Sequence, residues 1–350
     1  MLVLLGSVTA CGSGGSPSSA TGATERFLAR YVTTDGRVIR HGQGGDIVSE
    51  GQAYAMLLAE TAGRPALVRT IWSWTTMHLG RPDGLFAWHA TAEGQIEDPQ
   101  SATDADILIA YALLRYVGPD EAALHGAGRR VATAVLANES VRLADGAPLV
   151  VAGPWATSTA PPTVNPSYLM PGVFEALARF TGDGRWTRAA SSAVVAIRQL
   201  TANGRRLPPD WAVLAGGRLL ATPGPRQGPG VQYGLDAARL PLWFATACDP
   251  GARRLAAGWW RNVLHHVDGS GAVALTPTGA VVAAGSSPLI VLANAAAAAA
   301  AGDAHAAQRL RAHAAALAER APSYYGDAWA ALGPALLDRS IDPCTEPDGG

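Results

Sequence analysis

The chain has 350 residues, of which 48% are hydrophobic and 16% are charged, so it is long and apolar enough to bury a large core. Its formal net charge of −1 argues against nucleic acid or an anionic membrane surface as its main partner. It contains no run of 18 apolar residues, which argues against a membrane-spanning helix.

The first 24 residues have the composition of an export signal followed by a flexible tether. Residues 1–10 are apolar and end in small side chains, which is typical of a secretory signal. Cys11 follows Val-Thr-Ala, as in a bacterial lipobox whose cysteine is lipidated; the alternative is an isolated cysteine behind a signal peptide. Residues 12–24 are rich in Gly and Ser. We therefore expect an exported protein, extracellular or at the cell surface, anchored by a lipid on Cys11.

Two further cysteines, Cys248 and Cys344, lie far apart in the chain. In an exported protein a pair of cysteines suggests a disulfide. The spacing alone does not show whether these two residues lie close together.

Residues 25–340 are expected to form one all-α domain, followed by a C-terminal tail over 341–350. Only three short segments look like strands, at 148–152, 272–276 and 280–282. Twelve segments have helical apolar spacing, at 23–32, 49–62, 65–79, 103–117, 119–138, 168–181, 185–202, 235–248, 251–267, 287–301, 303–320 and 323–338. Twelve helices joined in pairs by short turns predict a closed ring of helical hairpins.

Four long connections interrupt this helical pattern. They span 80–102, 139–167, 203–234 and 267–286. Connections this long inside a compact helical domain are usually functional. Trp88, Trp155, Asp210 and Trp211 all lie in them, so we expect these loops to form the site.

The first motif with chemical potential is Ser-Glu-Gly-Gln at 49–52. Ser49 and Gln52 have the spacing of a capping box, which predicts Ser49 as a helix N-cap and places Glu50 in the first turn. An acid there either interacts with the helix dipole or serves as a proton donor in a cleft.

The second motif, Ser-Ala-Thr-Asp-Ala-Asp at 101–106, also opens a helix. Thr103 is the expected N-cap, and Asp106 is then its reciprocal partner in the cap. Asp104 has no role in such a cap, so it is available to face the cleft.

Two more motifs supply further polar groups. Asp236 and Arg239 are three residues apart and form either a surface ion pair or, if buried, a pair whose cation lowers the pKa of Asp236 and keeps it ionised. Tyr168, in Asn-Pro-Ser-Tyr, belongs either to the core or to a site where its hydroxyl binds a water molecule.

Together these four stretches resemble glycoside hydrolase family 8, and they occur in the order of that family's motifs. The resemblance covers essentially residues 25–340. Its carriers are Val-Ser-Glu-Gly-Gln-Ala-Tyr-Ala-Met (48–56), Ala-Thr-Asp-Ala-Asp-Ile-Leu-Ile-Ala-Tyr-Ala-Leu-Leu (102–114), Asn-Pro-Ser-Tyr (165–168) and Tyr-Gly-Leu-Asp-Ala-Ala-Arg-Leu-Pro-Leu-Trp (233–243), with weaker support from Phe-Ala-Trp (86–88), Pro-Asp-Trp (209–211) and Ser-Tyr-Tyr-Gly (323–326).

The resemblance implies an (α/α)6 barrel with a long cleft, and hydrolysis of β-1,4-linked glycans with inversion. Glu50 matches the family's proton donor, and Asp236 matches the base of the subfamily with an Asp-Ala-x-Arg motif. Asp104 matches the residue that holds the sugar at the bond being cut. Tyr168 and Arg239 match positions that help to place the attacking water and the base.

Aromatic residues in the long loops suit a sugar cleft, because the C–H faces of a pyranose pack on aromatic rings. We predict that Trp88 and Trp155 stack on the glycan, whereas Trp211 is equally suited to the core. The eight histidines show no metal-ligand spacing, so no metal or other cofactor is expected.

Our sequence-based hypothesis is therefore a monomeric endo-β-1,4-glucanase, a cellulase, whose partner is a β-1,4-glucan. A xylanase, a chitosanase or a lichenase on the same scaffold is an alternative, although few acidic residues in the loops slightly favour a neutral glycan. Two other classes are a non-catalytic glycan-binding lipoprotein and a helical interaction scaffold. The presence of both Glu50 and Asp236 argues against the former, and the loop Trp and Asp residues argue against the latter.

Overall fold

The computed structural model describes residues 19–225, 228, 230–269 and 271–345. In chain order its helices are α1 (Ser19–Tyr31), α2 (Ser49–Thr61), α3 (Pro65–Leu79), α4 (Thr103–Arg115), α5 (Glu121–Asn138), α6 (Pro154–Thr157), α7 (Pro171–Thr181), α8 (Gly184–Leu200), α9 (Arg239–Ala245), α10 (Pro250–Trp259), α11 (His265–Val267), α12 (Pro288–Ala300), α13 (Ala304–Arg320) and α14 (Tyr324–Leu337). A 3-10 turn, η1 (Pro166–Tyr168), precedes α7, and a π-helical turn, η2 (Trp260–Leu264), joins α10 to α11.

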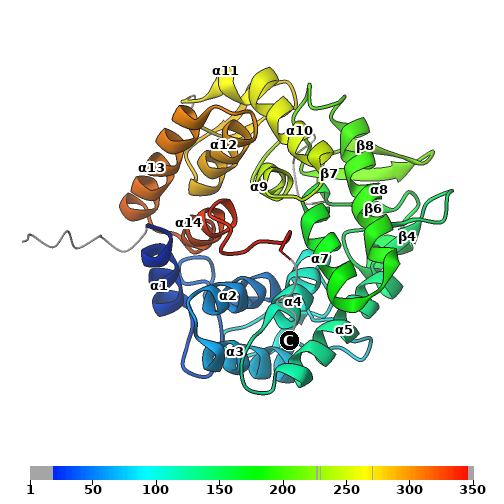
Figure 1. Cartoon of the computed structure of the whole chain (residues 1–350), viewed down its shortest axis with the longest axis vertical. Coiled ribbons are helices and arrows are strands. Elements are labelled where there is room, and N and C mark those ends of the chain that lie inside the picture. The colour runs from blue at the N-terminus through cyan, green and yellow to red at the C-terminus, as the bar shows by residue number, and fades with distance from the viewer. Residues whose placement is uncertain (1–18, 226–227, 229, 270, 346–350) are drawn as a thin grey trace, which may run out of the picture.

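Six helical hairpins form two concentric rings (Figure 1). The hairpins are α2–α3, α4–α5, α7–α8, α9–α10, α12–α13 and the pair of α14 with α1. The first helix of each pair lies in the inner ring, where α2, α4, α7, α9, α12 and α14 contact one another in that order and α14 closes onto α2. The expected (α/α)6 barrel is thus confirmed.

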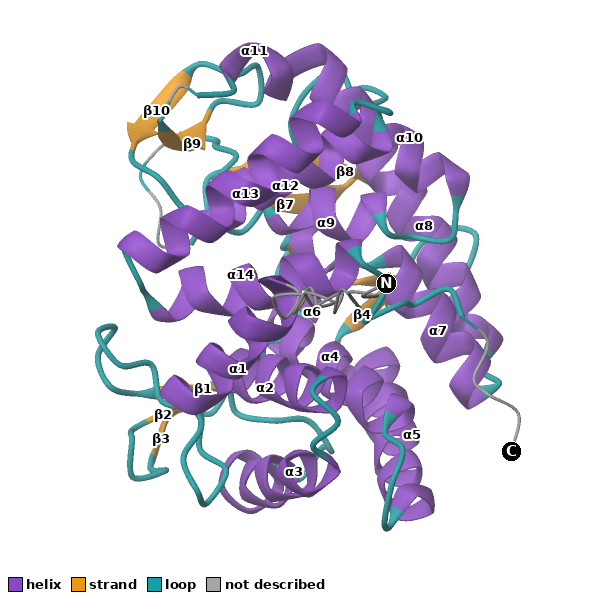
Figure 2. Cartoon of the chain, turned by 60° about the vertical axis from the view of Figure 1, so that its left-hand side comes forward, coloured by secondary structure: helices purple, strands orange, loops and turns teal. Residues whose placement is uncertain are grey.

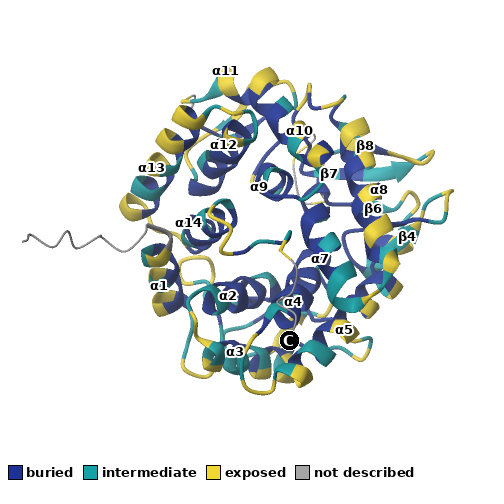
Figure 3. Cartoon of the chain, in the orientation of Figure 1, coloured by how far each residue is buried: buried dark blue, intermediate teal, exposed yellow. Residues whose placement is uncertain are grey.

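The two rings differ in burial because only the outer ring has a face toward solvent (Figure 3). Nearly every residue of α2, α4 and α12 is buried, which suits their runs of Ala, Leu and Ile. The outer helices α8 and α13 bury one stripe and expose charged side chains on the other. Alanine-rich stretches such as 295–301 let the inner helices approach closely.

The two ends of the barrel are built differently. Every inner helix except α14 is joined to the outer helix that follows it by a short turn, whereas the chain returns to the next inner helix mostly through a long loop. Since the inner helices therefore run parallel, their N-termini gather at the end that carries the long loops. The loops are the natural place for a site, because they vary without disturbing the ring.

The long loops contain small sheets that the sequence indicated only in part. The strands are β1 (Ile47–Val48), β2 (His89–Ala90), β3 (Ile96–Asp98), β4 (Ser140–Arg142), β5 (Pro148–Val150), β6 (Thr163–Val164), β7 (Trp211–Ala215), β8 (Arg218–Thr222), β9 (Ala272–Leu275) and β10 (Val281–Ala284). They pair as β1-β2-β3, β4-β5, β6-β7-β8 and β9-β10. Figure 2 shows both β9–β10, at the upper left, and β1–β3, at the lower left, on the same side of the helical barrel. Only β5, β9 and β10 were predicted.

All twelve predicted helical segments are helical, but three of them start three or four residues away from the predicted position. Helix α1 begins at Ser19, within the stretch expected to be a tether. Helix α7 begins at Pro171, since Tyr168 lies in a 3-10 turn that the Asn165 side chain caps. Helix α9 begins at Arg239 rather than near 235, because Asp210 accepts the backbone N–H groups of Gly234 and Ala237 and holds that segment in a turn.

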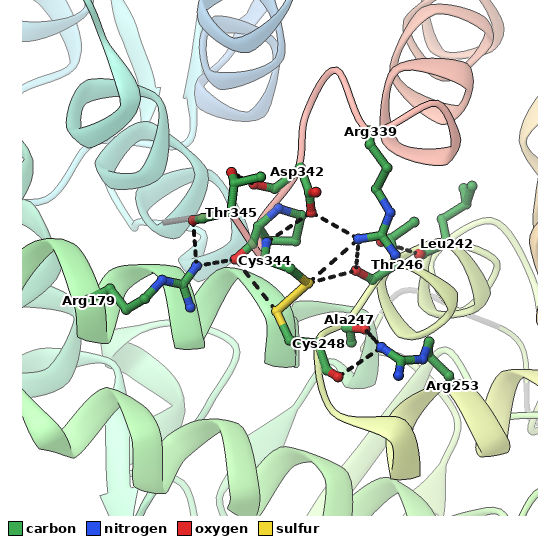
Figure 4. Close-up of a disulfide and its surroundings, with 11 residues drawn as sticks. Arg179, Leu242, Thr246, Ala247, Cys248, Arg253, Arg339, Asp342, Cys344 and Thr345 are labelled. Carbon is green, nitrogen blue, oxygen red and sulfur yellow. Dashed lines mark hydrogen bonds and ion pairs between the residues drawn. A yellow bond between two sulfur atoms is a disulfide. The ribbon is translucent and has the colours of Figure 1, made fainter. Parts of the chain in front are cut away.

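A disulfide closes the short-turn end of the barrel (Figure 4). After α14, the chain crosses this end, and Cys344 is bonded to Cys248 with a Cα–Cα distance of 5.4 Å. Ile341 is buried, and Arg179 donates to the carbonyl of Pro343. The suggested disulfide is confirmed, and residues 341–345 pack onto the domain rather than separating from it as a tail.

No helix in the described ranges has the length and apolar character that crossing a bilayer requires. The expected signal sequence, the lipobox Cys11 and most of the tether lie within residues 1–18, outside the described part of the chain.

We expect the double substitution Cys248→Ser and Cys344→Ser to destabilise the barrel, which should still fold. The disulfide links residues 96 positions apart, and removing a cross-link over a loop of this size lowers the free energy of unfolding by ~2–5 kcal/mol. Urea denaturation of both proteins, with and without reductant, measures the loss. Reduced wild-type protein should match the variant; a midpoint unaffected by either treatment would contradict a stabilising role.

Candidate active site

The candidate catalytic residues lie at the N-terminal ends of three inner helices. Glu50 is the second residue of α2, Asp104 is the second residue of α4, and Arg239 is the first residue of α9. Asp236 lies in the turn just before α9. Because the ring brings these helix ends to one mouth of the barrel, side chains up to 189 positions apart in sequence meet there.

A single buried guanidinium group links the three acids. Arg239 donates from Nη1 to Glu50 Oε1 at 2.6 Å and to Asp104 Oδ2 at 2.7 Å, and from Nη2 to Asp236 Oδ1 at 3.1 Å. Its side chain is only 4% exposed. Glu50 and Asp236 therefore lie within two hydrogen bonds and the width of one guanidinium group of each other. This separation is below about 9.5 Å, the largest distance between the two carboxyl groups of an inverting pair.

Glu50 and Asp236 are held by the protein through one oxygen each and are partly exposed to solvent. Glu50 Oε1 accepts from both Arg239 and the Tyr54 hydroxyl, the latter at 2.6 Å, which leaves Oε2 for a substrate. The side chains of Glu50 and Asp236 remain 20% and 34% exposed, whereas that of Asp104 is 7% exposed. One oxygen of each exposed acid can thus act on a substrate while the other is held by the protein.

The surroundings give these acids unusual proton affinities. Burial raises the pKa of Glu50 to about 7; Arg239 opposes this shift and the nearby Asp104 charge adds to it. A helix N-terminus favours the ionised form, so burial outweighs the dipole here. Burial also raises the pKa of Asp236 to about 6, against the lowering effect of Arg239. The expectation that the cation would lower this pKa is thus wrong, because desolvation is the larger effect.

Two residues of the Asn-Pro-Ser-Tyr motif border Asp236. The Tyr168 ring lies 5.4 Å from the guanidinium carbon of Arg239, so Tyr168 belongs to the site rather than to the core alone. The Asn165 side chain lies beside Asp236 and lowers its pKa. The Asn165 amide oxygen accepts from the backbone and hydroxyl of Ser167, which fixes the orientation of the side chain.

The predicted helix caps are wrong at both motifs. Val48 and Ala102 are the N-cap residues, and Ser49 and Thr103 are already the first helical residues. Gln52 does not close a capping box; it accepts from the backbone N–H of Val38 and donates to Thr75. The sequence pattern failed because both motifs are buried: Gln52 and Asp106 find partners in other segments, and the hydroxyls of Ser49 and Thr103 are buried without a cap hydrogen bond.

Asp106 also has another partner than the one predicted. Its Oδ1 accepts the backbone N–H of Phe86 at 3.1 Å, and its side chain hydrogen-bonds the carboxyl group of Glu139. The interaction connects α4 to the loop before it and to the end of α5.

Trp88 lies between the two acids that its loop was expected to serve. Its backbone N–H donates to Gln100 at 2.7 Å, and its carbonyl accepts from Ser49 at 3.0 Å, so it joins the starts of α4 and α2. Its ring stacks on His89 with centroids 4.8 Å apart. Trp88 thus bridges the segments that carry Glu50 and Asp104, and its contact with sugar stays a prediction.

The other two loop tryptophans are half-buried and pack against the core. Trp155 lies in α6, where a Cβ on Gly153 would come within 2.7 Å of its ring nitrogen, so the glycine allows the ring to lie flat against the backbone. Trp211 begins β7, directly after Asp210. Their roles in binding sugar also stay predictions.

Three tyrosines at the site were not identified as site residues from the sequence. Tyr54 holds Glu50, and its spacing of four residues on one helix face was the available signal. Tyr324 packs against Gly51 so closely that a Cβ there would overlap its hydroxyl, which explains a glycine beside the acid. The charges of Arg239, Glu50 and Asp236 act on the pKa of Tyr325, which places its hydroxyl at the same site.

Comparisons with known proteins agree with this geometry. The family model "Glycosyl hydrolases family 8" matches residues 4–335. An endoglucanase from Cellulomonas uda is 32% identical over 240 residues, which cover 67% of this chain and 65% of the relative. A probable endoglucanase from Novacetimonas hansenii is 33% identical over 237 residues, covering 62% of this chain and 64% of the relative. The alignments therefore span less than two thirds of either relative's own length.

Solved structures share the fold over nearly the whole chain. The endo-β-1,4-glucanase CMCax from Acetobacter xylinum has a TM-score of 0.75 at 24% identity, covering 93% of this chain and 100% of that one. A β-1,3-1,4-glucanase from Paenibacillus sp. X4 has a TM-score of 0.79 at 20% identity, covering 92% and 91%. At these identities the likeness shows the barrel fold.

We expect Arg239→Met to lower the free energy of unfolding by ~3–5 kcal/mol at neutral pH, because it leaves buried carboxylates without their cation. The loss should shrink as the pH falls below about 6, where Asp236 and Glu50 take up protons. Chemical denaturation at several pH values measures this. Arg309→Met, which breaks the exposed pair with Asp268, is the matched control and should cost less than about 1 kcal/mol. Equal losses for the two variants would contradict a central role for Arg239.

Proposed function

The chain belongs to glycosyl hydrolases family 8, and from that premise we propose that it is an inverting hydrolase of β-1,4-linked glucan, an endo-β-1,4-glucanase. The observation that carries the proposal is the pair Glu50 and Asp236, held on one guanidinium group with both side chains partly exposed to solvent. Relatives named endoglucanases support the choice of substrate.

The geometry assigns each acid a separate task in one displacement. Glu50, protonated through its raised pKa, donates from Oε2 to the leaving glycosidic oxygen. Asp236 accepts a proton from a water molecule, and that water attacks the anomeric carbon on the opposite face of the sugar. The C–O bond to the leaving group breaks as the new C–O bond forms, so the configuration inverts. Each acid ends in the other's starting protonation state, and solvent restores both.

The buried residues around the pair keep these tasks apart. Asp104, held at 2.7 Å from Arg239, is placed to accept a hydrogen bond from a sugar hydroxyl at the bond being cut. Tyr168 and Asn165 border Asp236, where they help to orient the attacking water and the base. Tyr54 fixes the oxygen of Glu50 that does not carry the proton.

The substrate assignment favours a neutral glucan over the alternatives. A xylanase, a chitosanase or a lichenase would use the same acid and base, and the solved structures with this fold include a reducing-end xylose-releasing exo-oligoxylanase. Acid and base together favour catalysis over a glycan-binding role without turnover. We also propose export and a lipid anchor on Cys11. The disulfide between Cys248 and Cys344 supports an oxidising compartment.

Glu50→Gln should lower kcat on carboxymethylcellulose by ~10²–10⁴, because a general acid contributes that much to proton transfer. Glucan binding should persist, since the amide keeps the shape of the side chain. Asp236→Asn should lose hydrolysis in the same way. A reducing-sugar assay measures kcat, and calorimetry with a cello-oligosaccharide measures binding. Near wild-type turnover in either variant would remove that residue from the mechanism.

The same assay on xylan, chitosan and mixed-linkage glucan tests the choice of substrate. We expect the highest kcat/KM on carboxymethylcellulose or mixed-linkage glucan. A preference for xylan or chitosan would move the assignment to that class while leaving the acid and base in place. No hydrolysis of any of them by the wild-type protein would favour the binding function.

The pH dependence of kcat/KM should be bell-shaped. The rate rises with pH as Asp236 ionises, through its pKa of about 6, and falls again as Glu50 loses its proton, through its pKa of about 7. Glu60→Gln is a matched control. Burial raises the pKa of Glu60 to about 7 as well, but Glu60 lies near the other end of α2 and pairs with Arg115 of α4. Its substitution should leave both limbs in place. A profile that keeps rising above pH 8 would show that Glu50 is not the acid.

A further inference from the structure

Two carboxyl groups that the proposed mechanism does not use lie buried against each other near Asp104. Asp106 is on α4, two residues after Asp104, and Glu139 directly follows α5. Neither residue has any exposed surface, and their side chains hydrogen-bond each other. Because an ionised carboxylate can only accept, a hydrogen bond between two carboxyl groups needs a proton on one of them.

The remaining contacts show where that proton lies. Glu139 Oε1 accepts from the Ser101 hydroxyl at 2.6 Å, and Asp106 Oδ1 accepts from the Phe86 backbone at 3.1 Å. The other oxygens, Glu139 Oε2 and Asp106 Oδ2, are buried without a hydrogen-bond partner among the described residues, and the Thr103 hydroxyl is the side-chain donor that also acts on Glu139. A proton shared between the two carboxyl groups satisfies Asp106 Oδ2, which two ionised groups would leave without a donor.

The charges around the pair favour keeping the proton. Arg81 is the cation that acts on both carboxyl groups, but it is already paired with Asp83 at 2.7 Å. Asp104 adds a negative charge on the same helix. Burial raises the pKa of Glu139 to about 7 and that of Asp106 well above its usual range.

The pair joins three segments that form one wall of the site. Phe86 and Ser101 belong to the loop 80–102, which carries Trp88 between them. Glu139 starts the loop 139–165, and its carbonyl accepts from Val151 at 2.9 Å. Asp106 ties both loops to the first turn of α4, where Asp104 contacts Arg239. A rigid link at this point fixes the height and the angle of Asp104 and Trp88 relative to Glu50.

We infer that Asp106 and Glu139 share a single proton, and that this shared proton holds the loop 80–102 and Asp104 in position at the active site. Both are positioning residues, since Arg239 and Asp104 lie between them and the reacting carboxyl groups. The effect on sugar binding rests on the proposed function, but the shared proton and the rigidity of the loop do not.

The test replaces the shared proton by a permanent donor. In Glu139→Gln the amide oxygen still accepts from Ser101, and the amide nitrogen takes the place of Oε2 and donates to Asp106 without any titrating proton. Glu139→Leu removes the link. Glu60→Gln is the control for a buried glutamate that pairs with an arginine instead of a carboxyl group.

Thermal unfolding at about pH 6 and about pH 9 measures the proton. In the wild-type protein burial raises the pKa of both carboxyl groups, so the folded state holds the shared proton more tightly than the unfolded state and stability is lost as the pH rises through these raised pKa values. Glu139→Gln should show a smaller fall in Tm between the two pH values than wild type. An equal fall in both proteins would overturn the shared proton.

Hydrogen–deuterium exchange of peptides from 80–104 measures the positioning and needs no turnover. At neutral pH we expect exchange to be slow in wild type, Glu139→Gln and Glu60→Gln, and faster in Glu139→Leu; if that variant does not fold, Glu139→Ala, which also removes the link, takes its place. Unchanged exchange on losing the link would overturn the positioning role.

Because Asp104 is proposed to hold the sugar, KM should rise about tenfold in Glu139→Leu and stay unchanged in Glu139→Gln, as expected for one buried hydrogen bond. Loss of the KM effect alone, with the exchange pattern as expected, would count against the role of Asp104 and not against the shared proton.

Discussion

The site depends on one buried cation that neutralises more than one acid. Arg239 contacts Glu50, Asp104 and Asp236 at 2.6, 2.7 and 3.1 Å, although its single charge cannot balance three carboxylates. The protein resolves the excess by protonation: burial raises the pKa of Glu50 to about 7 and that of Asp236 to about 6. A proton donor and a proton acceptor therefore coexist near neutral pH on one guanidinium group. The arrangement is costly to fold and useful for chemistry, as is typical of active sites.

The barrel makes this concentration of charge possible. The inner helices run parallel, so their N-termini, with unpaired backbone N–H groups, surround the acids. The long loops lie at the same end and carry Trp88, Trp155 and Asn165, while the opposite end is closed by short turns and by the segment bonded through Cys344. Stability and chemistry are thus separated along the barrel axis. Asp106 and Glu139 extend the same principle one layer outward, with protonation again replacing a counter-ion.

The sequence predicted the barrel well because helical periodicity is a local signal. All twelve segments with apolar spacing are helical, and the long loops between them were expected to form the site. The motifs around Glu50, Asp104, Tyr168 and Asp236 were found for the same reason. The roles of Ser49, Thr103 and Asp106 were predicted from local capping rules and proved wrong, because both helices start one residue earlier and Asp106 accepts from Phe86 in another segment. The contacts of Arg239 with Glu50 and Asp104, and of Asp106 with Glu139, join residues 189, 135 and 33 positions apart and leave no local pattern.

The central claim is that Glu50 and Asp236 act from opposite faces of the sugar in one displacement. The anomeric configuration of the first product tests it most directly, and proton NMR during hydrolysis of a soluble cello-oligosaccharide reads that configuration before mutarotation. The account predicts that the α-anomer of the new reducing end forms first from the β-linkage. Initial formation of the β-anomer would show a covalent intermediate and retention, and would contradict the assignment of Asp236 as a base.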